Sequence, residues 1–276
     1  LFHQQASHRQ RKNVLKSVKY NGAIHSGQEE VASAVDAHYG RAFGTVEPRS
    51  YTLNLQQLDL PHLDLSQLEE AFTMEEVENQ IKDMPPDRGP GPDGFTCAFF
   101  KACWDVIKVD VMAVVNHFSN LHATNLHWLN SANIALIPKK DGAEDISDFR
   151  PISLIHAVAN LFAKMMATRL SIHMNDLVSP AQSAFIKKRS IHDNFTYVRN
   201  LARRFHRSKT PMLLFKLDIK KAFNSVRWDF LMDLLRHLGF PARFPDWISA
   251  LLSTATSGVL INGVVGDPMK HGYGLR

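Results

Sequence analysis

Residues 215–223, FKLDIKKAF, preceded by the apolar run Met212-Leu-Leu, decide how the rest of the chain is interpreted. A strand that is apolar on both faces is typical of the middle of a sheet. This pattern predicts a buried strand over 212–218 that ends by presenting the carboxylate of Asp218. Such a carboxylate binds a metal or a proton, or else the strand simply emerges into solvent there, and the segment alone favours neither reading. Phe223 follows where the chain turns toward a helix, so its ring could lie beside whatever Asp218 binds.

A second pair of segments, LIPKKDG at 136–142 and DFRPISL at 148–154, predicts a β-hairpin. Two short β-type runs flank a connection that contains Gly and Asp. Lys139, Lys140 and Arg150 would then project from one hairpin. Lysine binds phosphate as a point charge and arginine as a planar fork. The alternative is a solvated charged hairpin, and for the two lysines alone that alternative is the better one.

Taken together, these segments resemble the fingers and palm of a reverse transcriptase, with the closest likeness to LINE-type (non-LTR) retrotransposon enzymes of plants. The segment RGPGPDGF at 88–95 resembles a Gly-Pro loop of that family, and QSAFIKKRSIHDN at 182–194 resembles another of its motifs. GYGLR at 272–276 resembles the run-up to its Gln-Gly-Asp-Pro motif. Residues 1–12 resemble the linker that joins its endonuclease to its polymerase. The motifs occur in the family's order along nearly the whole chain.

The resemblance implies roles for five residues at a polymerase site. Asp218 would be the catalytic carboxylate and, with the backbone carbonyl of Ile219, would bind metal. Mg²⁺ is the expected ion, because hard oxygen ligands and substrate phosphates suit it. Lys139 and Arg150 would hold the triphosphate of a deoxynucleotide. Phe223 would lie under the incoming sugar and exclude a 2′-hydroxyl by steric clash; the alternative for this residue is a plain core phenylalanine.

Charge agrees with a nucleic-acid partner, which by resemblance would be an RNA template and a DNA primer. The net charge is +5 and the pI is about 9.2, a mild indication of a polyanionic partner. Between residues 164 and 209 ten Lys or Arg stand against two acidic residues. Gln182, Arg189, Arg199 and Arg203 are the predicted nucleic-acid contacts. For the helical arginines the alternative is a solvated helix face.

The chain departs from the family's pattern in two ways. Lys188 stands where the family has Gly, which removes a flexible backbone position and adds a charge. The family's second carboxylate motif, which ends in Ala-Asp-Asp, is missing, and no two aspartates are adjacent anywhere. We therefore expect a fragment that is inactive alone and binds metal weakly. Two other readings stay open: a non-catalytic remnant that binds RNA or DNA, and a protein similar to a group II intron maturase.

The expected fold class is α+β, with helical fingers and a β-hairpin joined to an incomplete palm sheet of a right-hand polymerase. The expected regions are a linker at 1–72, fingers at 73–210 and a partial palm at 211–276. Thr73 and Glu76 fit a capping box, and Asn262-Gly263 is typical of a two-residue hairpin turn. Helices are predicted near residues 28–39, 156–174, 191–205, 227–238 and 245–254.

Other classes of function find no support in the sequence. Cys97 and Cys103 lack further ligands at zinc spacing. No segment resembles a signal peptide or reaches the length of a membrane span, so no membrane partner is expected. A nuclear location is implied only by the family resemblance.

Overall fold

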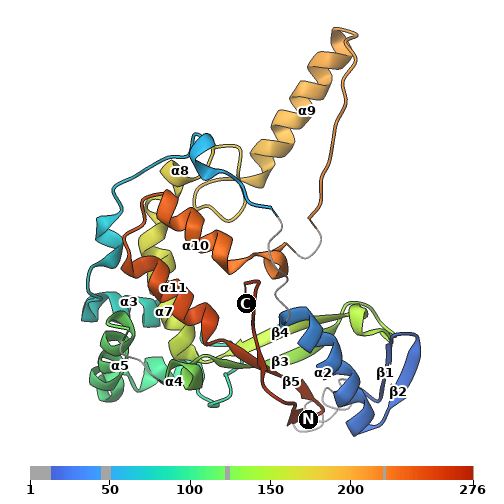
Figure 1. Ribbon diagram of the computed structural model, residues 1–276, viewed down its shortest axis with the longest axis vertical. Helices are drawn as coiled ribbons and strands as arrows, with labels where there is room; N and C mark the ends of the chain where they lie inside the picture. The colour runs from blue at the N-terminus through green and yellow to red at the C-terminus, as the bar shows by residue number, and fades with distance from the viewer. Residues whose placement is uncertain (1–13, 45–50, 122–124, 220–221, 276) are drawn as a thin grey trace.

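The computed structural model describes residues 14–44, 51–121, 125–219 and 222–275, and it has mixed helix and sheet architecture (Figure 1). A group of helices lies on one side of the molecule and the main sheet on the other. Ordered along the chain, the larger helices are α2 (Gln28–Gly44), α3 (Met74–Asp83), α4 (Cys97–Ala102), α5 (Trp104–Ser119), α7 (Ala157–Ser171), α9 (Ile191–Arg207), α10 (Trp228–His237) and α11 (Arg243–Ser253). Short pieces are α6 (Leu126–Leu129), α8 (Met174–Leu177), η1 (Leu55–Gln57), η2 (Ser66–Glu69), η3 (Ile146–Asp148) and η4 (Phe223–Ser225).

The main sheet has five strands, β3 (Ser131–Pro138), β4 (Phe149–Ile155), β5 (Thr256–Ile261), β6 (Val264–Val265) and β7 (Met269–Lys270). β3 and β4 form the predicted hairpin, with Ile137 opposite Arg150. β5 joins the other side of β3 in parallel, with Ser131 opposite Thr256. Between β5 and β6 the turn residues Asn262 and Gly263 have φ angles of 53° and 90°, which confirms the predicted two-residue turn.

The N-terminal part of the described chain packs on this sheet. β1 (Ser17–Tyr20) and β2 (Ala23–Ser26) form a hairpin, and α2 follows it. Buried residues of β1 and α2, including Val18, Val31 and Val35, share one apolar cluster with Ile134 and Val259 of the sheet. The helix predicted near 28–39 is confirmed and extends further. The predicted domain boundary at residue 72 stays a prediction, but residues 14–44 share their core with the sheet.

A carboxylate of α2 gives a pH-dependent prediction. The Asp36 carboxylate lies so close to Gly266 that a Cβ on that glycine would meet Asp36 Oδ1 at 2.8 Å. Burial, and secondly the charge of Asp267, raise the pKa of Asp36 above its ordinary value. A raised pKa means that the ionised form costs the folded state free energy, and this cost appears as the pH rises from the ordinary value through the raised one. Asp36→Asn should therefore raise the melting temperature at pH 7 and give no gain at a pH below the ordinary aspartate pKa.

Thermal unfolding of wild type and variant at both pH values checks this expectation. Asp267→Asn is the matched control. It removes the negative charge that is the second cause of the raised pKa of Asp36, so it should raise the melting temperature at pH 7 by a smaller amount. Equal melting temperatures of the Asp36→Asn variant and the wild type at pH 7 would show that burial of this carboxylate is without cost.

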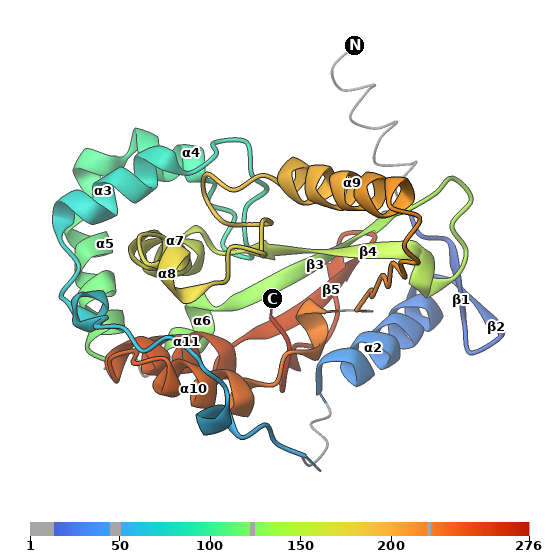
Figure 2. The same cartoon turned by 90° about the horizontal axis from the view of Figure 1, so that it is seen from above.

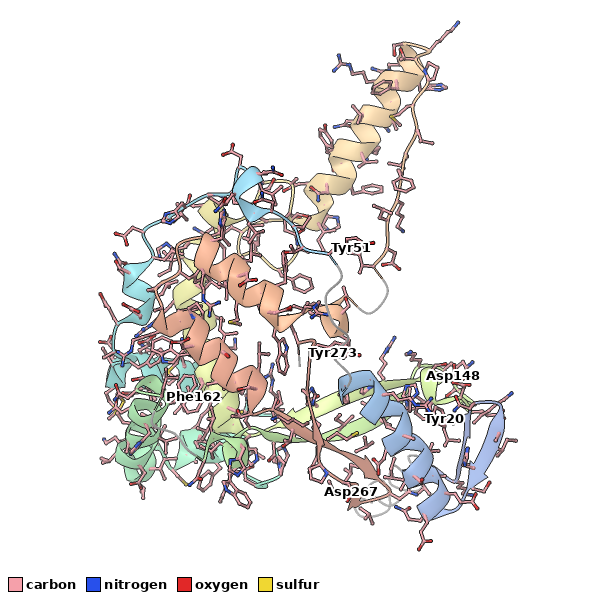
Figure 3. All side chains as sticks on the ribbon, viewed as in Figure 1. Tyr20, Tyr51, Asp148, Phe162, Asp267 and Tyr273 are labelled. Carbon is pink, nitrogen blue, oxygen red and sulfur yellow. The ribbon has the colours of Figure 1, made fainter. Side chains whose placement is uncertain are left out.

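The larger apolar core joins the helices. Phe118 of α5 stacks on Phe162 of α7 with ring centroids 4.1 Å apart, and the fully buried Trp247 of α11 lies against Phe118. The Trp247 Nε1–H donates to the carbonyl of Ser119 at 2.9 Å, so its one polar group has a partner. In Figure 3, Phe162 is labelled among these helices.

A partly buried arginine, Arg169, connects α7 to the segment that leads into α3. Thr73 Oγ1 accepts a hydrogen bond from the backbone N–H of Glu76 at 3.2 Å, which confirms Thr73 as the N-cap. Glu76 itself makes a different contact from that expected of a capping box. Its carboxylate receives two hydrogen bonds from Arg169, at 2.8 and 2.7 Å, and the same guanidinium donates to the carbonyls of Leu68, Glu70 and Ala71.

The predicted buried strand over 212–218 is wrong in this structure. Residues 211–219 are extended without strand pairing, and their side chains are exposed, among them Leu213 and Phe215. A strand that is apolar on both faces needs neighbours on both edges and a cover on both faces. Among the described residues β5 already carries β6 and β7, and no described element covers this segment. Figure 1 shows it beside the projecting helix α9, whose apolar residues are also exposed.

Candidate active site and nucleic-acid interface

Asp218 lies near the end of this exposed segment, next to Ile219 and just before residues 220–221, which are outside the described part of the chain. Across the described ranges, no group of three or more His, Cys, Asp or Glu side chains lies close enough to hold a metal ion. Two metal ions in a polymerase site need several carboxylate ligands. The residues present therefore offer one carboxylate and do not complete such a site.

Phe223 is 60% exposed, and hydrogen bonds hold the turn in which it lies. It begins η4, and its carbonyl accepts a hydrogen bond from the N–H of Leu275 at 2.8 Å. The N–H of Gly274 donates to Val226 O at 2.7 Å, and Trp228 Nε1 donates to Gly274 O at 2.7 Å. Gly274 has a φ of +81°, which favours glycine at this contact. The segment 272–275 thus lies against the turn that carries Phe223.

A small pocket of about 110 Å³ adjoins this contact and is lined by residues from separate parts of the chain. Ser153 of β4 and Ile134 of β3 contribute from the sheet, Phe43 from α2, and Asn224 and Tyr273 from the two joined segments. Tyr273 is labelled near the centre of the molecule in Figure 3. The hairpin, the turn of Phe223 and the segment before residue 276 therefore meet at one place.

The charged residues of the β3–β4 hairpin differ in their contacts. Lys139 Nζ donates to the carbonyl of Ser147 at 2.6 Å, and Lys140 forms an ion pair with Asp148 at 3.0 Å. The hydrogen bond from Lys140 lowers the pKa of the Asp148 carboxyl. The side chain of Arg150 is exposed on β4. All three side chains are exposed, and the two lysines also contact the connection between the strands.

Arg189 organises a loop rather than projecting from it. Its Nε, Nη1 and Nη2 groups make five hydrogen bonds, to Asn175 Oδ1 and to the carbonyls of Asn175, Val178, Ser179 and Gln182. All five N–H donors of a guanidinium are thereby used. Gln182 Nε2 donates to Ala184 O at 3.2 Å within the same loop. The predicted nucleic-acid contacts of both residues stay predictions, and the contacts seen here are structural.

Arg199 and Arg203 lie on α9, with exposed side chains. Figure 1 shows α9 projecting away from the sheet, and Figure 2 shows the same helix from above. Its last turn adds Arg204, His206 and Arg207. The helix therefore presents a basic surface, although no described contact tests whether nucleic acid binds there.

Two residues of the loop before α9 have left-handed backbone conformations. Lys188 has a φ of +70°, which gives a physical reason for glycine being preferred at this position. Phe185 has a φ of +65°, and its ring is 94% exposed. Its centroid lies 6.4 Å from that of Phe223, with the rings at 81°. Phe185 was not predicted as a functional residue, because an aromatic residue next to Ile186 is typical of a buried core position.

The Gly-Pro loop at 88–95 is anchored through His156. His156 Nε2 lies 3.0 Å from Ser131 Oγ, and Nδ1 lies 3.0 Å from Asp93 Oδ2 without the alignment of a hydrogen bond. A Cβ on Gly91 would lie 2.5 Å from the backbone nitrogen of His156. The second Gly of the loop is therefore required for close backbone approach. A pocket of about 340 Å³ separates Arg88 and Phe95 from Ser153 of β4.

Comparison with known proteins agrees with the motif likeness. Residues 137–270 match the family model described as "Reverse transcriptase (RNA-dependent DNA polymerase)". The "Transposon TX1 uncharacterized 149 kDa protein" of Xenopus laevis is 29% identical over 209 residues, which is 76% of this chain and 16% of that protein. The "Retrovirus-related Pol polyprotein from type-2 retrotransposable element R2DM" of Drosophila melanogaster is 31% identical over 159 residues, 58% of this chain and 14% of that protein.

A third relative is the "Probable RNA-directed DNA polymerase from transposon BS" of Drosophila melanogaster, which is 23% identical over 229 residues, 81% of this chain and 25% of that protein. The chain thus spans a quarter or less of these relatives. In the described part of the chain no helix is long and apolar enough to cross a membrane. The matched stretch contains β4 of the hairpin, Asp218 and Phe223, so residues 137–270 are similar to reverse transcriptases, and the relatives carry the names of transposon or retrotransposable-element proteins.

Proposed function

We propose that the chain is part of an RNA-directed DNA polymerase of a LINE-type retrotransposon, which copies RNA into DNA in its complete protein. The observation that carries the proposal is the family match over 137–270, which joins the hairpin and the Asp218–Phe223 segment in one domain. Fingers at 73–210 and a partial palm at 211–276 are the corresponding assignment within a right-hand polymerase. The Gly-Pro loop and the motif at 182–194 are the ground for proposing a plant source.

Reverse transcriptases use divalent metal ions, and we propose Mg²⁺ as the ion here. The Asp218 carboxylate and the carbonyl of Ile219 would supply some of the ligands of this ion, because Mg²⁺ prefers oxygen ligands and substrate phosphates. The remaining carboxylates would come from elsewhere in a longer protein. The bound ion would neutralise charge on the transferring phosphates.

The nucleotide and nucleic-acid assignments rest on position. Arg150 is the better candidate for the triphosphate, because its exposed fork can bind phosphate in a bidentate manner; Lys139 would have to give up its bond to Ser147 O. An RNA template and a DNA primer would lie along the basic side chains of α9, namely Arg199 and Arg203. Gln182 and Arg189 would act by shaping the neighbouring loop.

Primer extension tests the proposal directly. A longer protein that contains this chain should extend a DNA primer on an RNA template with deoxynucleotides, and absence of any extension would reject the polymerase assignment. A nucleic-acid-binding module without catalysis is the second candidate, favoured because no group of three or more possible metal ligands lies together in the described part of the chain. The retrotransposon names of the relatives favour either candidate over a group II intron protein.

The ring of Phe223 gives a specificity prediction for the active protein. Phe223→Val should raise the use of ribonucleotides relative to deoxynucleotides by about 10-fold or more, because the smaller side chain no longer clashes with a 2′-hydroxyl. The measurement is kcat/KM for both nucleotide types in primer extension. Phe215→Val, an exposed phenylalanine eight residues earlier, is the control and should leave the ratio unchanged. An unchanged ratio in Phe223→Val would return this residue to a structural role.

Binding by the 276-residue chain gives a second prediction. Its affinity for single-stranded RNA should fall by roughly 10- to 1,000-fold between 50 and 200 mM salt, because release of counterions from phosphates drives such binding. Replacing Arg199 and Arg203 together by Gln should reduce the slope of log K against log salt by about 1 to 2. Fluorescence anisotropy over a salt series measures both. An affinity that is independent of salt would contradict a basic binding surface.

A further inference from the structure

The loop 178–189 exposes the apolar ring of Phe185 to solvent, and hydrogen bonds within the loop hold the backbone in the conformation that exposes it. Phe185 is 94% exposed, although Ser183 and Ile186 in the same loop are both buried. Its φ of +65° is a genuine outlier for a bulky residue. Both the left-handed backbone and the solvated ring cost free energy. A conformation of this kind persists only where its surroundings determine it.

Those surroundings are the five hydrogen bonds of Arg189. They tie the side chain to carbonyls from Asn175 to Gln182, on the N-terminal side of Phe185. On the other side, the backbone N–H of Arg189 donates to Ile186 O at 3.1 Å. The chain on both sides of the ring is therefore pinned to one guanidinium, and Phe185 is presented at the tip of a rigid loop.

The exposed ring has an aromatic neighbour from a distant part of the chain. Phe223, 60% exposed, meets it edge to face at 6.4 Å. Its turn is independently pinned by hydrogen bonds from the segment 274–275. Lys187 and Lys188 lie two and three residues after Phe185, and both are exposed. Two fixed aromatic rings with cationic neighbours are suited to a flat aromatic ligand that carries negative charge.

We propose that Phe185 is a stacking residue for an unpaired nucleobase of a bound nucleic acid strand, with the edge of Phe223 as the second wall and the lysines at the adjoining phosphates. This inference rests on the proposed function, because it names how a strand bound to this domain is held. Stacking of a base on an aromatic side chain contributes about 1–3 kcal/mol, which corresponds to about a 5- to 150-fold change in affinity.

The test compares two probes on the 276-residue chain at one salt concentration. One probe is a single-stranded RNA oligonucleotide, and the other is an abasic ribose-phosphate strand of the same length. Wild type should bind the base-containing strand about 5- to 150-fold more tightly than the abasic one. Phe185→Asn should abolish that difference and leave the affinity for the abasic strand unchanged, whereas Phe185→Tyr should retain it.

Asparagine is the chosen replacement because it tolerates a left-handed backbone. The melting temperature of Phe185→Asn should be equal to or above that of wild type, which separates loss of the ring from loss of the fold. Phe195→Ala on α9 removes another exposed phenylalanine, and this control should keep the full preference for the base-containing strand.

Each contrary outcome has a distinct meaning. A Phe185→Asn variant that keeps the wild-type preference would overturn the stacking role and leave the proposed function intact. Failure of wild type to bind either strand would contradict the proposed function itself, and the stacking role with it.

Discussion

Asp218→Asn should reduce primer extension by the complete protein about 1,000-fold or more. A metal held at a polymerase site contributes several kcal/mol to the transition state, and a tenfold change in rate corresponds to about 1.36 kcal/mol. An amide is neutral and binds a hard divalent cation weakly. Because Asp218 lies in an exposed segment, its replacement should not disturb a packed core. The measurement is the single-turnover rate of nucleotide addition.

Asp105→Asn is the control for this prediction, because the Asp105 side chain is 94% exposed on α5, among the helices on the far side of the sheet. It should extend primers at the wild-type rate. RNA binding by Asp218→Asn should stay within about twofold of wild type, since one exposed carboxylate has little effect on phosphate contacts. Extension by Asp218→Asn at the wild-type rate would remove this residue from the metal site.

Arg169→Ala should destabilise the folded chain by about 3–5 kcal/mol. Removing one partner of a largely buried ion pair leaves the other charge unpaired, and here the Glu76 carboxylate, 19% exposed, would lose its partner. The carbonyls of Leu68, Glu70 and Ala71 would also lose their donors, and the Phe72 ring would lose the guanidinium that lies 4.1 Å from its centroid. Urea unfolding, followed by circular dichroism, measures the change.

Lys164→Ala on the same helix is the matched control, because Lys164 is exposed; its effect should be within about 0.5 kcal/mol. The double variant Arg169→Ala with Glu76→Gln should recover part of the loss, since it leaves no unpaired carboxylate. If the single variant Arg169→Ala unfolded at the wild-type urea concentration, the pair would contribute no net stability.

Features that depend on neighbouring residues could be predicted from the sequence. The cap at Thr73, the turn at Asn262-Gly263 and the β3–β4 hairpin are set by local backbone preferences, and the structure confirms all three. Residues 137–154 and 215–223, which carry the two functional likenesses, lie within the stretch that matches the family model. Local pattern was therefore sufficient for the likeness to reverse transcriptases and for much of the secondary structure.

Features that depend on distant partners could not be predicted. The apolar run 212–218 reads as a buried strand, yet its burial requires neighbours that the described elements do not offer. Arg169 and Arg189 look like ordinary basic residues in the sequence, but each binds several backbone carbonyls from 7 to 101 residues away. Phe185 differs from an ordinary core phenylalanine in its left-handed backbone conformation, with a φ of +65°. That conformation is visible in the structure and not in the sequence.

The parallel pairing of β3 with β5 has a consequence for the order of folding during synthesis. Ser131 and Thr256 are partners although 125 residues separate them (256 − 131 = 125), and the cluster under α2 also needs Val259 and Ile261. A nascent chain that has emerged only through β4 therefore exposes an unpaired edge of β3 and an uncovered apolar face of α2. Contacts of such long sequence separation form slowly, and open strand edges invite pairing with other chains. The N-terminal half of this chain should accordingly depend on holding chaperones until β5 has left the ribosome.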